Sequence, residues 1–183
     1  IAIFCYVGAE VSIGSYLVSL MGQPDIAGLP AEQAGKYLSF YWGGAMVGRF
    51  VGSALMRSIA PNRLLAFNAV AIAVLIGIAL SVGGHVAMWA LILIGLFNSI
   101  MFPTIFSLAL EGLGNLTSKG SGLLCMAIVG GAVMPLVQAF FADRVGLLPS
   151  FAVPLVCYLY IVWFGAKGYR ADEGTAHPAP HSS

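Results

Sequence analysis

The stretch from Leu64 to Leu110 contains no Asp, Glu, Lys or Arg over 47 residues. A membrane-spanning helix needs about 20 mostly apolar residues, so this stretch is too long for one span. The dipeptide Gly83-Gly84, followed by His85, supplies a natural turn within it. The sequence therefore predicts a tight hairpin of two membrane helices in the middle of the chain.

The composition of all 183 residues is also typical of a membrane protein. Hydrophobic residues make up 60% and charged residues 8%, whereas soluble proteins carry about 25% charged residues. A net charge of +1 offers no basic surface for nucleic acid, so we expect no nucleic-acid partner. The three cysteines form no C-x-x-C pair, and we expect neither a metal site nor a cofactor.

Charged and turn-forming residues divide the chain into six apolar segments. We therefore expect an all-α membrane protein with six transmembrane helices embedded in the lipid bilayer, at about 1–21, 36–56, 64–82, 86–110, 122–142 and 151–166. This six-helix bundle occupies residues 1–168, and the polar residues 169–183 are expected to form a disordered cytoplasmic tail. Because Ile1 already lies in an apolar run without an initiator Met, we expect the chain to be part of a longer protein.

Lysine and arginine in the short loops predict the orientation. On the side that holds both ends of the chain the basic residues are Arg57, Arg63, Lys119, Lys167 and Arg170, and on the other side they are Lys36 and Arg144. Loops richer in Lys and Arg stay in the cytoplasm. The excess of five against two predicts that both ends of this segment are cytoplasmic.

An internal repeat recurs at one offset of 87 residues. Its matches are Gly8, Ser12 and Ile13 with Gly95, Ser99 and Ile100, the run 43–47 with 130–134, and Arg57 with Arg144. The repeat contains three helices, an odd number, so the second copy must cross the membrane in the opposite sense. Two inverted three-helix repeats are typical of secondary transporters.

Four phrases in these helices resemble a known family. They are Tyr6-Val7-Gly8-Ala9-Glu10, Gly43-Gly44-Ala45-Met46-Val47-Gly48-Arg49-Phe50, the run from Phe97 to Phe106, and Gly120-Ser121-Gly122-Leu123-Leu124-Cys125. These four sequence segments resemble the C-terminal half of a major facilitator superfamily sugar transporter in the fucose permease family. The likeness is greatest to bacterial glucose/galactose transporters.

The resemblance implies secondary active transport of a hexose by alternating access. Glucose and galactose are the implied substrates, with fucose as a further candidate, and a proton or a sodium ion is the implied coupled cation. It also implies the cell inner (plasma) membrane and a missing N-terminal six-helix half. The carboxylates linked to the proton in the fucose permease lie in that missing half.

Glu10 is the sharpest candidate residue because it is a carboxylate in the middle of an apolar run. An acidic side chain at that depth costs about 2.5 to 3.5 kcal/mol to insert, so something must compensate for it. We expect Glu10 to bind substrate or the coupled ion. The alternative is an ion pair with Arg49. Fucose-type relatives carry an amide at this position, which favours hydrogen bonding to sugar.

Asn98 and Phe102 lie on one face of the fourth predicted helix, at helical spacing. An amide can bond sugar hydroxyls, and an aromatic ring offers a flat apolar surface to a sugar. Pro103 should kink the helix beside them. In the alternative, Asn98 bonds a neighbouring helix and Phe102 faces lipid or the protein core.

The remaining site predictions concern further binding residues, hinges and a gate. Tyr6 and Gln138 complete the predicted sugar-binding set, although Gln138 could equally bond another helix. The predicted hinges are Gly43, Gly44, Pro103, Gly130, Gly131 and Pro135, because they interrupt helices in corresponding repeats. Arg49, Arg57 and Gly48 are the predicted gating or coupling residues, and the acid that precedes the arginine in the family motif is replaced by Met56.

Two other functions compete with sugar transport. An intramembrane enzyme would need a nucleophile with a base, or clustered metal ligands, at membrane depth. No histidine lies inside a predicted span and Glu10 is the one acid well inside, so we expect no enzyme. A major facilitator transporter of a different solute, such as a drug exporter, is the stronger alternative.

Overall fold

The computed structural model describes residues 1–168, and these residues form helices joined by short turns, without strands. The α-helices are α1 (Ala2–Met21), α2 (Ala31–Leu55), α3 (Pro61–Val82), α4 (Gly84–Asn98), α5 (Met101–Leu110), α6 (Thr117–Met126), α7 (Gly130–Val145) and α8 (Ala152–Trp163). Short helices complete the set: η1 (Gly114–Leu116), η2 (Ala127–Val129), η3 (Pro149–Phe151) and η4 (Phe164–Gly168). The predicted tail, 169–183, lies outside the described residues.

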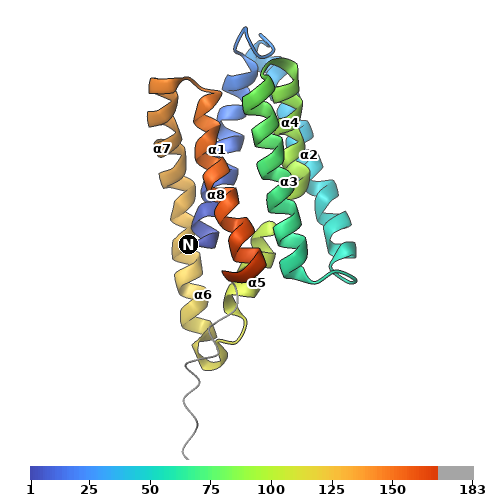
Figure 1. Ribbon diagram of the computed structural model, residues 1–183, viewed down its shortest axis with the longest axis vertical. Helices are drawn as coiled ribbons and strands as arrows, with labels where there is room; N and C mark the ends of the chain where they lie inside the picture. Colours follow the sequence, from blue (N-terminus) through green and yellow to red (C-terminus); the bar gives the residue numbers. More distant parts are fainter. Residues whose placement is uncertain (169–183) are drawn as a thin grey trace, which may run out of the picture.

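These helices combine into six rods that run side by side (Figure 1). Four of the rods are long and apolar enough to cross a membrane: α1, α3, the stretch Gly114–Val145 that contains α6 and α7, and the stretch Pro149–Lys167 that contains α8. A fifth is the bent pair of α4 and α5. The sixth rod, α2, has 25 residues but also carries Glu32, Lys36 and Arg49. The prediction of an all-helical membrane protein is confirmed.

The connections between rods lie alternately at the two ends of the bundle (Figure 1). At the α3–α4 turn, Gly83 and Gly84 have φ values of 70° and 55°, which only glycine adopts readily. This turn is the hairpin break that the sequence predicts. The connection between α2 and α3, which contains Arg57, lies at the other end. The first turns of α3 and α6, which carry Arg63 and Lys119, lie at that end too, as does Lys167 in η4, while Arg170 lies outside the described residues.

The packing of the rods follows the 87-residue repeat. The packing joins the two copies in equivalent ways: α2 of the first copy packs on α4 of the second, and α7 of the second packs on α1 of the first. Likewise α3 packs on α4, and α8 packs on α1. Glycines lie at both equivalent crossings. A Cβ at Gly95 would meet the backbone of Tyr41, and a Cβ at Gly8 would meet Met134 and the carbonyl of Gly130. The absence of side chains there lets the backbones approach closely.

The rod formed by α4 and α5 is bent by 44° at its break. Pro103 lies just beyond the break and has no N–H to donate to the carbonyl of Ser99, four residues earlier, so the regular hydrogen-bond pattern cannot continue there. The bend expected beside Pro103 is therefore present. It places Asn98 at the end of α4 and Phe102 at the start of α5.

Candidate functional site

Glu10 lies half-buried on α1 and faces a pocket of about 340 Å³ between α1 and α2. The pocket is lined by Glu10, Val11, Gly14, Ser15, Leu38 and Trp42. We call it the Glu10 pocket. Its volume falls in the range of small-molecule sites, about 300 to 1,000 Å³. A carboxylate, a hydroxyl and an indole ring are therefore gathered beside apolar side chains.

The ion pair with Arg49, the alternative reading of Glu10, is not formed. Within residues 1–168 the one ion pair joins Lys36 and Glu32, at 3.5 Å. Arg49 lies seven residues after Trp42, which places both on nearly the same face of α2, about 10 Å apart along the axis. Glu10 therefore lines the pocket without an ion-pair partner among residues 1–168.

Trp42 is a pocket residue that the sequence analysis missed. It is 54% exposed although it lies in the middle of a helix. Its ring packs edge-on against Tyr41, with ring centroids 5.3 Å apart, and lies near the Cα of Gly14, where an added Cβ would be 3.8 Å from the indole. The available signal was its position directly before Gly43-Gly44, on the same helix face as Arg49.

Asn98, predicted to bind sugar hydroxyls, is 1% exposed, and its side chain is bonded by two tyrosines. Its Nδ2 donates to Tyr41 Oη at 3.0 Å, and Tyr158 Oη donates to its Oδ1 at 2.7 Å. Tyr6 Oη donates to its backbone carbonyl at 2.9 Å. A sugar would have to displace a tyrosine to reach this amide, so in this conformation the amide bonds neighbouring helices.

The structure brings Tyr6 and Phe102 together, one turn from Glu10. Their ring centroids are 6.3 Å apart, and Phe102 stacks in turn on Phe106 at 6.1 Å. Tyr6 precedes Glu10 by four residues on α1, so the two share a helix face. The aromatic side chains therefore lie beside the Glu10 helix, and both phenylalanines are half-buried.

Gln138 lies apart from this group. It is fully buried, and its Nε2 donates to Ser150 Oγ at 3.2 Å, beneath the connection between α7 and α8. Its Oε1 has no hydrogen-bond partner within residues 1–168. Along α7 it lies about 10 Å beyond Gly131, whose neighbour on α1 is Val11. This position favours the alternative in which Gln138 bonds another helix and does not bind sugar.

The predicted hinge and gate residues have different surroundings. Gly43 has open space where a Cβ would be, whereas Gly48 packs against the carbonyl of Leu96 on α4. Gly130 packs on the backbone of Phe4, and Gly131 lies against Val7 and Val11. Pro135 lies inside α7, and its carbonyl accepts a hydrogen bond from Tyr16 Oη at 3.0 Å. Arg57 is exposed in the turn after α2.

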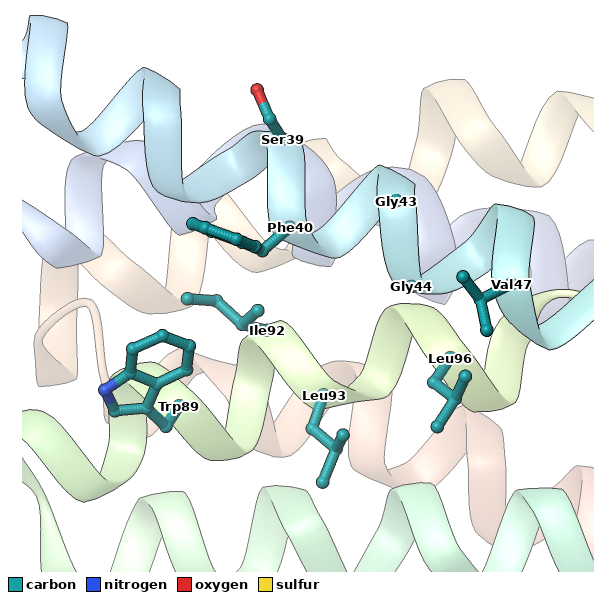
Figure 2. Close-up of a pocket in the computed structure, with 9 residues that line it drawn as sticks. All are labelled: Ser39, Phe40, Gly43, Gly44, Val47, Trp89, Ile92, Leu93 and Leu96. Atoms are coloured by element: carbon teal, nitrogen blue, oxygen red, sulfur yellow. The ribbon is translucent and has the colours of Figure 1, made fainter.

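A larger hollow of about 530 Å³ lies between α2 and α4. Figure 2 shows Phe40 and Trp89 at one end of this groove and Val47 and Leu96 at the other. Ser39 is the one hydroxyl in its lining, which is otherwise apolar. At about 100° per residue, Phe40 lies on roughly the opposite face of α2 from Leu38 and Trp42. The groove is thus separate from the Glu10 pocket, and no charged side chain lines it.

The comparisons with known proteins agree with this architecture. No family model matches the chain. A glucose/galactose transporter of Brucella abortus is 54% identical over 171 residues, which cover 93% of this chain and 42% of the relative. A putative glucose/galactose transporter of Helicobacter pylori is 52% identical, with coverage of 96% and 44%. The L-fucose-proton symporter of Escherichia coli is 38% identical, with coverage of 96% and 40%.

A solved structure of a protein from the same group has the same fold as this chain. The crystal structure of FucP, a major facilitator superfamily transporter in the outward conformation, matches with a TM-score of 0.88 and 36% identity, and the match covers 93% of this chain and 41% of FucP. This chain spans less than half the length of the curated relatives it matches. The identities, the shared fold and the confirmed resemblance show that the chain belongs to the major facilitator superfamily, among the relatives of the fucose permease.

Proposed function

We propose that this chain is the C-terminal half of a hexose transporter that works by alternating access and couples sugar movement to a cation. The observation that carries the proposal is the Glu10 pocket, where a carboxylate without an ion-pair partner in residues 1–168 lies beside an exposed indole in an apolar bundle. The relatives named for glucose, galactose and fucose support a sugar and do not favour a drug exporter. They also favour a transporter over an enzyme.

In this proposal Glu10 accepts hydrogen bonds from sugar hydroxyls, and Trp42 covers the apolar face of the ring. Carboxylates bond hydroxyls strongly because the acceptor is charged, and indole rings supply a large flat surface with little conformational freedom to lose. Tyr6 and Phe102 form the adjoining wall. Asn98 supports that wall, and it contacts sugar only if a tyrosine gives way. Gln138 is assigned to packing.

The partner of this surface is the missing N-terminal six-helix half. The relatives are more than twice the length of this chain, so each has room for a second bundle. Alternating access then moves one half against the other around a site near the middle of the membrane. Arg49 and Arg57 follow Trp42 toward the end of the bundle that we predict to be cytoplasmic, and they are proposed to gate it, with Gly48 letting α2 move closely along α4.

A proton is the proposed coupled ion, because one relative is named a fucose-proton symporter. Sodium is the other candidate. The proposed location is the inner membrane, with both ends of this segment in the cytoplasm. The proposed hinges are Gly43 and Gly44 inside the continuous helix α2, Pro103 in α5, and Gly130, Gly131 and Pro135 in α7, where a missing side chain or N–H weakens the helix.

Glu10→Gln in the full-length protein tests the proposal. The amide keeps the size of the side chain but loses the charge. We expect uptake of glucose or galactose to fall at least tenfold, measured with radiolabelled sugar in proteoliposomes with and without a proton or sodium gradient. If exchange across the membrane persists and accumulation is lost, the charge serves coupling; if both fail, it serves binding.

The matched control is Glu111→Gln, which removes a carboxylate from an exposed position at the end of α5. It should leave uptake within about twofold of the unmodified protein. Normal sugar affinity and normal accumulation in Glu10→Gln would contradict the proposal. Uptake of dyes or hydrophobic amines, but of no hexose, by the unmodified protein would favour the exporter instead.

A further inference from the structure

The break between α4 and α5 is held by side chains from three other helices. Tyr6 belongs to α1, Tyr41 to α2 and Tyr158 to α8, and each is bonded to Asn98 at the end of α4. These contacts join residues 57 to 92 positions apart in the chain. One residue at a helix break is therefore connected to half of the rods in the bundle.

One of these hydrogen bonds satisfies the backbone carbonyl that the break leaves free, and the other two satisfy the side-chain amide of Asn98. In an unbroken helix the carbonyl of Asn98 would accept from the N–H four residues later; here Tyr6 Oη donates to it. The side-chain oxygen accepts from Tyr158, and the side-chain nitrogen donates to Tyr41. Tyr6 and Asn98 are at most 2% exposed, and Tyr41 and Tyr158 are completely buried.

A buried, paired network of this kind favours one geometry strongly. In an apolar interior an unpaired polar group loses its bonds to water without replacement, so a change of bend that pulls Asn98 from one tyrosine must supply another partner. Pro103 alone permits many bend angles, because it removes a bond and adds none. The tyrosines select among them.

Phe102 connects this network with the proposed sugar site. It lies one turn after Asn98, just beyond the break, and its ring packs against that of Tyr6. Tyr6 is in turn one turn from Glu10 on α1. The angle of the bend therefore determines where the Phe102 ring lies relative to the Glu10 pocket.

We infer that Tyr6, Tyr41 and Tyr158 form with Asn98 a latch that fixes the bend between α4 and α5 and thereby positions Phe102 beside the Glu10 pocket. We call these four residues the tyrosine latch. Tyr41 and Tyr158 are positioning residues that do not contact sugar, whereas Tyr6 also belongs to the wall beside the Glu10 pocket. The latch itself follows from the contacts at the break, and its effect on sugar affinity rests on the proposed function.

The bend is measurable as a distance between two spin labels. Val86, near the start of α4, and Ser107, on α5, are both exposed. In a straight helix their backbones would be about 31 Å apart, and the 44° bend shortens this by about 2 to 3 Å. Labels are attached to cysteines at these positions in the full-length protein after all of its native cysteines, including Cys5, Cys125 and Cys157, are replaced by alanine.

The test variants are Tyr41→Phe and Tyr158→Phe, which remove one hydroxyl each and keep the packed ring. Two tyrosines on the same helices serve as controls. They are Tyr37→Phe, one turn before Tyr41, and Tyr160→Phe, two residues after Tyr158. Neither of these tyrosine hydroxyls makes a hydrogen bond within residues 1–168, and both rings pack on other aromatic side chains.

We expect the latch variants to broaden the Val86–Ser107 distance distribution or add a second peak, and the controls to leave it unchanged. The dissociation constant for hexose should rise about two- to tenfold in the latch variants alone, as expected for one lost buried hydrogen bond. A role in folding alone would lower the unfolding temperature and leave the distance distribution as it is, and that outcome would overturn the inference.

The distances and the affinities separate this inference from the proposed function. Unchanged distances in both latch variants would refute the latch, whatever the sugar affinity. Changed distances with normal hexose affinity would retain the latch and refute the placement of sugar beside Phe102. If Tyr158→Phe fails to fold, the distance distribution of Tyr6→Phe gives the same test from α1, with Tyr37→Phe and Tyr160→Phe still as the controls.

Discussion

Glu10 and Trp42 face the same pocket from neighbouring helices, and their exposure has to be explained in an apolar bundle. Trp42 is 54% exposed in the middle of α2. The same exposure is found for Trp163 at the end of α8, where the centroid of the ring lies 5.5 Å from that of Tyr160. The two tryptophans therefore differ in their neighbours and not in their accessibility.

Replacing Trp42 by leucine should weaken hexose binding about tenfold, because the flat surface beside Glu10 is lost. Trp163→Leu, with the same exposure, should change the affinity less than twofold. Equilibrium binding of radiolabelled glucose or galactose to the purified full-length protein measures both. Equal losses in the two variants would show that any exposed tryptophan matters for stability, and that Trp42 has no special contact with sugar.

At the residue scale, the sequence located the polar positions but not their partners. Glu10 and Asn98 are conspicuous because polar groups in apolar runs are expensive. The partners of Asn98 are tyrosines on three other helices, and a tyrosine in a membrane helix looks the same in sequence whether it faces lipid or a buried amide. Predicting this network requires the packing of the helices.

The helices follow the hydropathy pattern except where polar segments extend them. α2 begins at Ala31, five residues before the predicted start, because its first two turns are polar and carry the exposed pair Glu32 and Lys36. α6 begins at Thr117, five residues before the predicted start of that span at Gly122. Hydropathy identifies the part of a helix that suits lipid, whereas the helix itself continues into water.

Close helix crossings explain why particular glycines occur in these helices. At Gly95 a Cβ would lie 2.9 Å from the carbonyl carbon of Tyr41 and 3.1 Å from its Cα, and the backbone of α2 cannot move aside cheaply. Gly77, in the interior of α3, has open space around it. The two glycines are both helical and differ only in what surrounds them.

Gly95→Ala should therefore destabilise the protein by about 1 to 3 kcal/mol, the usual cost of overpacking. Gly77→Ala should stabilise it by about 0.5 to 1 kcal/mol, because alanine restricts the unfolded chain and favours a helix. Thermal unfolding of the full-length protein in detergent measures both changes. A stabilising effect of Gly95→Ala would contradict the close crossing of α2 and α4.

At the scale of the whole molecule, the bundle has two chemically different sides. One contains the Glu10 pocket, and the other contains the apolar groove between α2 and α4, which presents one hydroxyl (Figure 2). A transporter half needs a polar side toward its partner half and an apolar side toward lipid. The repeat and the hydropathy predict this arrangement of helices, and the pocket itself emerges only from their packing.

The orientation of the bundle is a prediction about the whole molecule, and it can be tested without sugar. Asp25 is exposed in the connection between α1 and α2, and Asn115 is exposed between α5 and α6, at the opposite end (Figure 1). The basic residues Arg57, Arg63, Lys119 and Lys167 share the Asn115 end, so that end should be cytoplasmic. In a cysteine-free full-length protein, Asp25→Cys should react with a membrane-impermeant thiol reagent added to intact cells, and Asn115→Cys should react only after the membrane is permeabilised. Reaction of Asn115→Cys in intact cells, with Asp25→Cys protected, would reverse the orientation and move the proposed gate at Arg49 and Arg57 to the outer face.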